Sequence, residues 1–171
     1  MYAQERRMAI LECLRQTRQP VSASSLAERF SVSRQIIVGD IALLRAAGEQ
    51  ISATPRGYVI LEANPGLTRR IACRHDAAGM EAELNTIVDY GCTVLDVTVE
   101  HPVYGQLTGS LQLSSRYDVG QFMKKCAQAG ARPLSDLTGG IHLHTLSCPG
   151  QEAYERTREA LARLGVLLEE Q

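Results

Sequence analysis

Three short helical patterns and a hairpin pattern follow one another within the first 61 residues. The first expected helix carries Met8, Leu11 and Leu14 at the three-residue spacing of one buried stripe. A short second helix is expected at 22–30, and a strand-turn-strand pattern at 51–61 closes the segment. The segment is therefore expected to fold as a small helical domain with an appended hairpin.

The third helical pattern begins after Ser33, whose hydroxyl suits an N-cap. Ile37, Ile41 and Leu44 follow at i, i+4 and i+7, so they line one buried face and leave the opposite face free to enter a DNA groove. A short helix, a tight turn and such a helix are typical of the helix-turn-helix, and a basic hairpin makes it the winged variety. A helical hairpin used for protein contacts is the alternative. The residues expected to contact DNA are Ser33, Arg34, Gln35, Val38 and Arg56.

The charge is divided unequally along the chain. Residues 1–61 hold eight arginines and five acidic residues, a net charge of +3, whereas residues 62–171 hold ten basic and fourteen acidic residues, a net charge of −4. This division favours a polyanion partner for the first part alone. Chance division of the charges on solvated faces is the other explanation.

No long apolar run follows the N-terminal residues, so neither a signal peptide nor a membrane span is expected, and the protein is expected in the cytoplasm. The five cysteines are scattered and include no C-x-x-C pair. We therefore expect reduced core residues rather than a disulfide framework or a zinc finger.

The pattern changes after a short linker at 62–68 that contains Asn-Pro-Gly. We expect a winged helix-turn-helix domain over 1–62 and a second domain over 69–171. The second domain shows the order β-α-β-β-α-β-α, which predicts an α/β (α+β) fold: an antiparallel sheet with helices on one face, an open-faced sandwich. The expected strands are 69–73, 93–100, 106–114 and 141–146, and the expected helices are 76–90, 118–130 and 151–165.

All four histidines lie in the second domain. His142 and His144 are two residues apart on an expected strand, so both imidazoles point to the same face. His75 precedes an expected helix that carries Glu83, and both reach the same site if that helix end packs against the strand. Imidazoles with one carboxylate suit zinc, nickel or iron(II). Exposed or core histidines are the alternative explanation of an H-x-H pair alone.

Longer stretches carry a resemblance to a known family. SRQIIVGDIALLR at 33–45 with TPRGY at 54–58 resembles the small winged helix of bacterial metabolite-responsive regulators. CRHD at 73–76, IVDYG at 87–91, VTVEHPVYG at 97–105 and PLSDLTGGIHLHT at 133–145 resemble the three-histidine domain. This pair of domains, over nearly the whole chain, is similar to the niacin-responsive repressors of NAD biosynthesis and niacin transport.

The resemblance implies a homodimer that binds a pseudo-palindromic double-stranded DNA operator, with nicotinic acid as co-repressor. It also implies one divalent metal ion per subunit. His101 matches a family histidine, for which a turn-shaping role and pocket lining both stay open. The implied metal ligands are His75, Glu83, His142 and His144, and the candidate ligand-binding residues are His101, Tyr104, Ser135 and Thr138.

Two other functions compete with this reading. A metalloenzyme fused to a DNA-binding head needs a general base, for which Asp76, Glu81 and Asp136 are available, but the sequence holds no H-E-x-x-H motif. A regulator of the same architecture that senses another small carboxylate is the second. We expect a regulator and not an enzyme.

Overall fold

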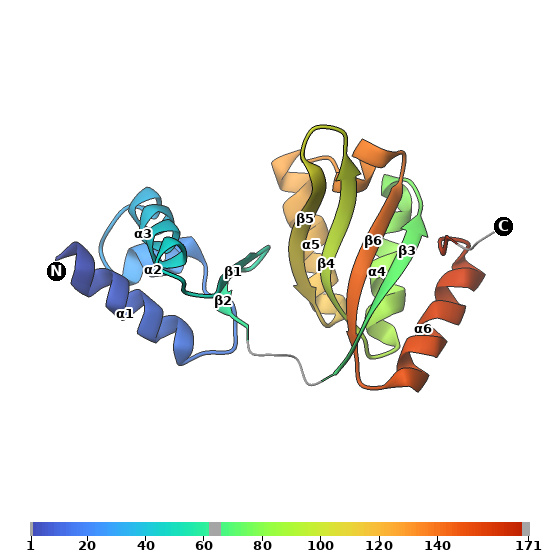
Figure 1. Ribbon diagram of the computed structural model, residues 1–171, viewed down its shortest axis with the longest axis horizontal. Coiled ribbons are helices and arrows are strands. Elements are labelled where there is room, and N and C mark those ends of the chain that lie inside the picture. Colours follow the sequence, from blue (N-terminus) through green and yellow to red (C-terminus); the bar gives the residue numbers. More distant parts are fainter. Residues whose placement is uncertain (1, 62–65, 169–171) are drawn as a thin grey trace. The chain divides into compact units, whose positions relative to one another are not determined.

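The computed structural model describes residues 2–61 and 66–168. The chain divides into two compact units, Met1–Asn64 and Pro65–Gln171, which are drawn in Figure 1 and are described separately below.

The first unit contains three helices and a two-stranded hairpin. Both predicted caps form, because the Ser22 hydroxyl accepts a hydrogen bond from the Ser25 N–H and the Ser33 hydroxyl accepts one from the Ile36 N–H. The third helix buries Ile37, as predicted. The elements are α1 (Ala3–Arg15), α2 (Ala23–Arg29), α3 (Arg34–Ala46), β1 (Ile51–Thr54) and β2 (Gly57–Ile60).

The predicted stripe of α1 is partly wrong. Met8 is 60% exposed, whereas Ile10, Leu11 and Leu14 are buried. At about 100° per residue, Met8 stands roughly 120° around the helix from Leu14, outside the arc that faces α3. The buried stripe is therefore centred on Ile10 and Leu14.

The second unit is a four-stranded antiparallel sheet in the order β3-β6-β4-β5. Helices α4, α5 and α6 contribute Leu84, Val119 and Leu161 to one core on a single face of that sheet, and Figure 1 shows α4 and α5 behind the strands. The predicted sandwich is thus confirmed. Its elements are β3 (Leu67–Arg74), α4 (Met80–Asp89), β4 (Thr93–His101), β5 (Gly105–Leu113), α5 (Arg116–Ala129), β6 (Ile141–Cys148) and α6 (Gln151–Leu164), with short 3-10 turns η1 (Ala77–Gly79) and η2 (Leu134–Thr138).

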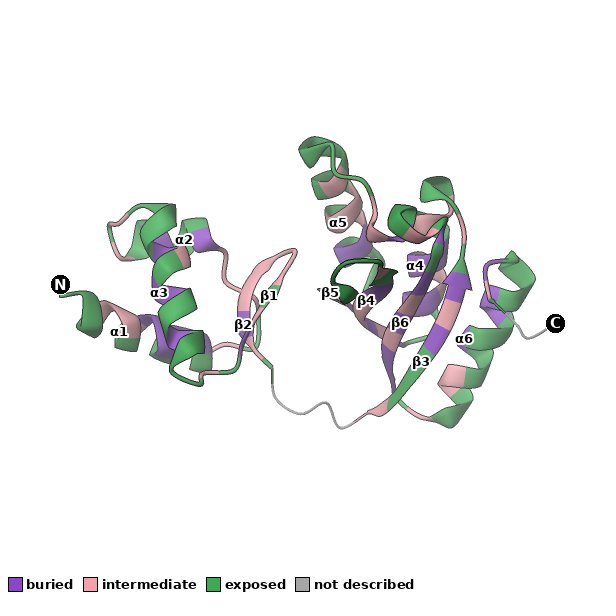
Figure 2. Ribbon diagram, turned by 45° about the horizontal axis from the view of Figure 1, so that its top comes forward, coloured by how far each residue is buried: buried purple, intermediate pink, exposed green. Residues whose placement is uncertain are grey.

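A β-bulge divides β4, whose sequence at 93–100 alternates as in a regular strand. Val94 pairs with Leu146, but Asp96 pairs with Thr145, so Leu95 is an extra residue. The bulge exchanges the two faces, and Val94 and Val97 both contact the helix-side core. Figure 2 shows buried and intermediate residues along the central strands, and in β4 they do not alternate regularly.

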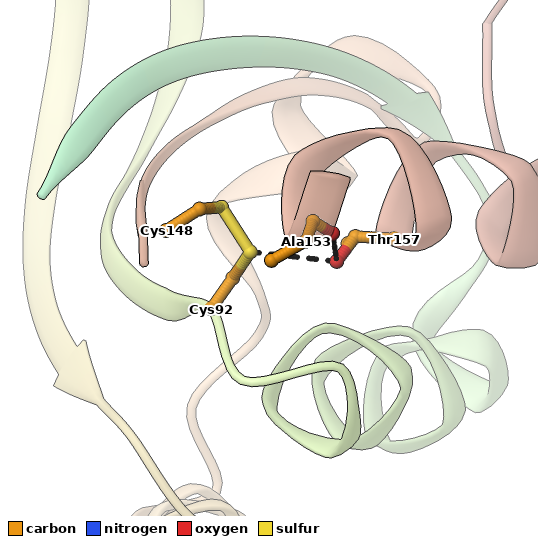
Figure 3. The surroundings of a disulfide bond; sticks show 4 residues. All are labelled: Cys92, Cys148, Ala153 and Thr157. Atoms are coloured by element: carbon orange, nitrogen blue, oxygen red, sulfur yellow. Dashed lines mark hydrogen bonds between the residues drawn. A yellow bond between two sulfur atoms is a disulfide. The ribbon is translucent and has the colours of Figure 1, made fainter. Parts of the chain in front are cut away.

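The expectation that all five cysteines are reduced is wrong for two of them. Cys92 and Cys148 form a disulfide, with the Cys92 sulfur also 3.4 Å from the Thr157 hydroxyl (Figure 3). Cys92 precedes β4 and Cys148 ends β6, and the register pairs Thr93 with Ser147, so the two cysteines are neighbours across the sheet. A sequence separation of 56 residues gives no local signal of this pairing.

Candidate metal centre and nucleic-acid interface

The four predicted metal ligands lie together between the sheet and α4. His142 and His144 point from β6 toward the helices, and Glu83 reaches them from the first turn of α4. The ligand atoms of His75, Glu83 and His142 all lie within 4.8 Å of one another. The Glu83 Oε2 atom is 2.6 Å from His75 Nε2, 3.2 Å from His142 Nε2 and 3.3 Å from His144 Nε2.

Each imidazole is oriented by a backbone carbonyl on its far side. His75 Nδ1 lies 2.6 Å from the Asp76 carbonyl oxygen, His142 Nδ1 lies 2.8 Å from that of Gly140, and His144 Nδ1 lies 2.8 Å from that of Asp96. These bonds require the Nδ1–H form, so every Nε2 is directed at the centre. The carbonyl that orients His144 belongs to the bulge of β4, which gives the bulge a part in building the site.

The electrostatics of this cluster suit a cation. Burial alone would raise the pKa of Glu83, but hydrogen bonds from His142, His144 and His75 hold that pKa well below its usual value. The Glu83 hydrogen bond raises the pKa of His75, and it also raises that of His144 against the opposing effect of burial. Three neutral Nε2 lone pairs and a carboxylate repel one another unless protons or a metal ion lie between them. This donor set fits a divalent transition metal.

Two glycines hold His75 in place. A Cβ on Gly140, whose φ is +93°, would lie 2.3 Å from the His75 carbonyl oxygen, and one on Gly79 would lie 2.8 Å from His75 Cβ. The Gly140 carbonyl also accepts the His142 Nδ1–H and, at 3.4 Å, the His75 backbone N–H. Gly140 therefore helps to position two histidines of the site, His142 on β6 and His75 on the segment before α4.

Cys73 is a neighbour of the site that sequence reasoning assigned only to the core. It is fully buried and pairs with His142 across β3 and β6. Burial, and then the nearby Glu83 carboxylate, raise the pKa of its thiol well above the usual value. Cys73 lies two residues before His75, and this spacing was the sequence signal that could have placed both side chains on the same face.

The candidate ligand-binding residues do not form one group. A hollow of about 250 Å³ beside His142 includes Thr138, and a second, of about 490 Å³, borders His75 and includes Arg132. Ser135 is buried, and its carbonyl accepts the Gly140 N–H at 2.8 Å. The other two candidates, His101 and Tyr104, lie at the β4–β5 turn and line neither of these hollows.

At that turn, His101 Nδ1 accepts the backbone N–H groups of Val103 and Tyr104, at 3.1 and 3.2 Å. The His101 ring also stacks at a tilt on Tyr104, with the ring centroids 4.9 Å apart. These contacts match the turn-shaping role that the sequence left open for His101.

The predicted DNA-contacting residues of α3 lie at its N-terminal end. Ser33 uses its hydroxyl as the cap, while Arg34 and Gln35 are exposed and Val38 is half-buried. On the other side of α3, the buried Asp40 carboxylate accepts a hydrogen bond of 2.6 Å from Arg6 of α1. This ion pair fixes α3 on α1 and leaves its outer side clear.

The hairpin is attached to the helices by a short β-bridge. Val21 and Tyr58 exchange two backbone hydrogen bonds of 2.8 Å. Gly57 allows this approach, because a Cβ there would lie 2.3 Å from the Val21 carbonyl oxygen. The bridge holds the turn that carries Arg56 beside the helical core.

These features define a class: a winged helix-turn-helix protein whose second, α/β domain holds a buried cluster of three histidines and one carboxylate. Residues 6–59 match the HTH domain model and residues 68–170 match the 3H domain model. The chain belongs to the 3H-domain family of transcription repressors.

Two relatives of this architecture align over nearly their whole length. The chain is 44% identical over 167 residues to the probable transcription repressor NiaR of Thermotoga maritima, covering 98% of this chain and 95% of the relative. It is 42% identical over 169 residues to the transcription repressor NadR of Bacillus subtilis, covering 96% and 94%. An uncharacterized protein of Methanothermus fervidus is 32% identical over 105 residues, 57% of this chain and 16% of that protein.

Family membership supports a repressor and not the competing metalloenzyme. Within residues 2–61 and 66–168, no helix is long and apolar enough to cross a membrane.

Proposed function

We propose that this protein represses genes of NAD biosynthesis or niacin uptake, with nicotinic acid as co-repressor at a metal centre of the second domain. It acts in the cytoplasm as a homodimer on a pseudo-palindromic operator. The proposal is carried by one observation: three Nε2 atoms converge on the buried Glu83 carboxylate in a domain joined to a helix-turn-helix. The kinship with two named repressors supports the transcriptional role.

His75, Glu83, His142 and His144 would hold one zinc, nickel or iron(II) ion per subunit. The two histidines of β6 come from a rigid strand, whereas His75 and Glu83 come from the segment and helix packed over it. The ion would therefore join two elements that are distant in sequence. With these four ligands, a five- or six-coordinate ion would supply an open coordination position and positive charge.

Nicotinate offers a pyridine nitrogen and a carboxylate, either of which can fill an open coordination position. The hollow that borders His75 is large enough for such a ring and is lined by Arg74 and Arg132 together with Asp76 and Asp136. An arginine of this lining that pairs with the carboxylate would favour nicotinic acid over its uncharged amide.

The test is DNA binding in the presence and absence of the effector. We expect operator affinity of the metal-loaded protein to change with nicotinic acid and not with nicotinamide, as measured by fluorescence anisotropy. A response of equal size to the amide would contradict the carboxylate specificity, and no response to either would contradict the sensor function.

A further inference from the structure

The irregular part of β4 is irregular toward both of its neighbouring strands. β4 lies between β5 and β6 in the sheet (Figure 1). Against β6, Leu95 is the extra residue described above. Against β5, Val94 pairs with Leu113. The next pair joins Asp96 to Ser110, so two residues of β5 face one residue of β4. The regular ladder of backbone hydrogen bonds is therefore interrupted on both sides of β4 at the same level.

Gln112 is one of the two residues of β5 at this level, and its backbone is unusual for a residue with a side chain. Its φ is +55°, in the left-handed region. The Gln112 side-chain amide donates a hydrogen bond of 3.3 Å to the Leu95 carbonyl oxygen. A residue keeps such a conformation where the surrounding contacts determine it, and this bond is one of those contacts. Gln112 thus holds the bulge of β4 from the side of β5.

Asp96 holds the bulge from the other side, against β6. Its carboxylate accepts the backbone N–H of Thr145 at 3.2 Å. Its own carbonyl oxygen accepts the His144 Nδ1–H at 2.8 Å, which directs Nε2 of that ring toward Glu83, at 3.3 Å. Two successive residues of β6 are therefore attached to one residue of β4. The carboxylate fixes the place of Asp96 beside β6, and the carbonyl then fixes the ring.

We propose that Gln112 and the Asp96 carboxylate are positioning residues for His144 as a metal ligand. Both act through the backbone of the bulge. The Leu95 carbonyl that Gln112 holds belongs to the peptide unit next to the one whose carbonyl orients His144, so a rotation of the first unit moves the second. The proposal rests on the metal centre proposed above and adds the residues that aim one of its ligands.

The other two imidazoles of the centre provide an internal comparison. His142 is oriented by the Gly140 carbonyl and His75 by the Asp76 carbonyl, and neither of these carbonyls belongs to the bulge. A loosened bulge should therefore displace His144 and leave His142 and His75 in place. A purely structural role of the bulge would instead affect the three rings alike.

Gln112→Glu is the sharpest variant, because it keeps the size and the backbone strain of the residue but cannot donate to the Leu95 carbonyl as a carboxylate. We expect the zinc affinity of the full chain to fall about tenfold, measured by competition with a chromophoric chelator. Gln128→Glu, at an exposed position of α5, is the matched control and should leave the affinity unchanged.

Asp96 is tested by a pair of variants. Asp96→Ala removes the acceptor of the Thr145 N–H, and zinc affinity should again fall about tenfold. Asp96→Asn keeps an acceptor oxygen at the same place, so it should restore most of the affinity. An Asp96→Asn variant as weak as Asp96→Ala would overturn the role of the carboxylate contact.

NMR of isotope-labelled protein gives a readout for each ring. In Gln112→Glu the Nδ1–H signal of His144 should shift, whereas the signals of His142 and His75 should stay in place. Unchanged zinc affinity, a stationary His144 signal, or equal shifts at all three histidines would overturn the proposal. The same spectra are recorded without metal, where the His144 signal tests the bulge independently. A wild type that binds no zinc would contradict the proposed metal centre instead.

Discussion

Gly140 shows how one residue without a side chain organises the candidate metal site. Its carbonyl orients His142, and its missing Cβ leaves room for the backbone of His75. Gly140→Ala should therefore lower zinc affinity about 10- to 100-fold, the usual cost of losing a residue that supports metal ligands. Competition with a chromophoric chelator measures it.

The matched control is Gly139→Ala. Gly139 also has a positive φ, of +60°, but a Cβ there meets nothing within 4 Å. Both variants carry the backbone strain of a side chain at positive φ, and only the first displaces His75. Equal zinc affinities of the two variants would show that Gly140 does not position the site.

His144→Ala tests the ligand set at the level of one side chain. The variant should keep its helix content and weak DNA binding, because the first unit has its own core, but it should lose nicotinate binding. Treating the wild type with a chelator should give the same result, and added metal should reverse it. Circular dichroism and calorimetry provide the two readouts. Wild-type nicotinate affinity in His144→Ala would mean that this histidine does not serve the effector.

At the scale of single residues, the four candidate ligands were named from the H-x-H spacing, from the expected helix that carries Glu83 and chiefly from the family resemblance. The structure brings these four side chains together, but the groups that orient them were not predicted. The contact of Gly140 with His75 joins residues 65 positions apart, and no local pattern reports such a contact.

At the scale of elements, we expect α3 and the β1–β2 hairpin to contribute to DNA binding in different ways, which two variants can separate. Arg34 is exposed at the start of α3, where it can reach base edges, so Arg34→Ala should cost about 1–3 kcal/mol on the operator and relax sequence specificity. Arg56 lies in the hairpin turn, so Arg56→Ala should weaken binding to all sequences similarly. Titrations on operator and scrambled duplexes distinguish them. Unchanged operator affinity in the double variant would contradict this docking of α3.

The disulfide between the start of β4 and the end of β6 should stabilise the second unit against unfolding. It closes a loop across 56 residues, and bonds of this kind typically stabilise by about 2–4 kcal/mol. Cys92→Ser should lower the free energy of urea unfolding by that order under oxidising conditions, whereas Cys126→Ser, at an unpaired and half-buried cysteine, should change it little. Titration of five free thiols in the unreduced, unfolded wild type would contradict the bond.

The order of the elements could be predicted because hydrophobic period and turn residues are local signals. The register could not. The sequence around Leu95 is compatible with a regular alternating strand and also with a bulge. Only the pairing of Asp96 with Thr145 reveals the extra residue. The same two strands also pair Thr93 with Ser147, which places Cys92 beside Cys148, so the bulge and the disulfide were missed for one reason: both depend on long-range strand partners.

For the whole molecule, the account requires that the effector and DNA sites be coupled. If nicotinic acid raises operator affinity by some factor, the operator must raise nicotinic acid affinity by the same factor. The function at this scale was accessible mainly through resemblance, because fold and composition alone suit many regulators. Sequence periodicity gave the two domains, while the motifs around the histidines gave the effector hypothesis.

The most direct measurement is calorimetric titration of the zinc-loaded protein with nicotinic acid, nicotinamide and NAD, repeated after chelation. The account predicts binding of about one nicotinic acid per subunit to the loaded protein, much weaker binding of the amide and of NAD, and loss of nicotinic acid binding on chelation. Equal nicotinic acid affinity with and without metal would contradict the central claim that the cluster of His75, Glu83, His142 and His144 senses the effector.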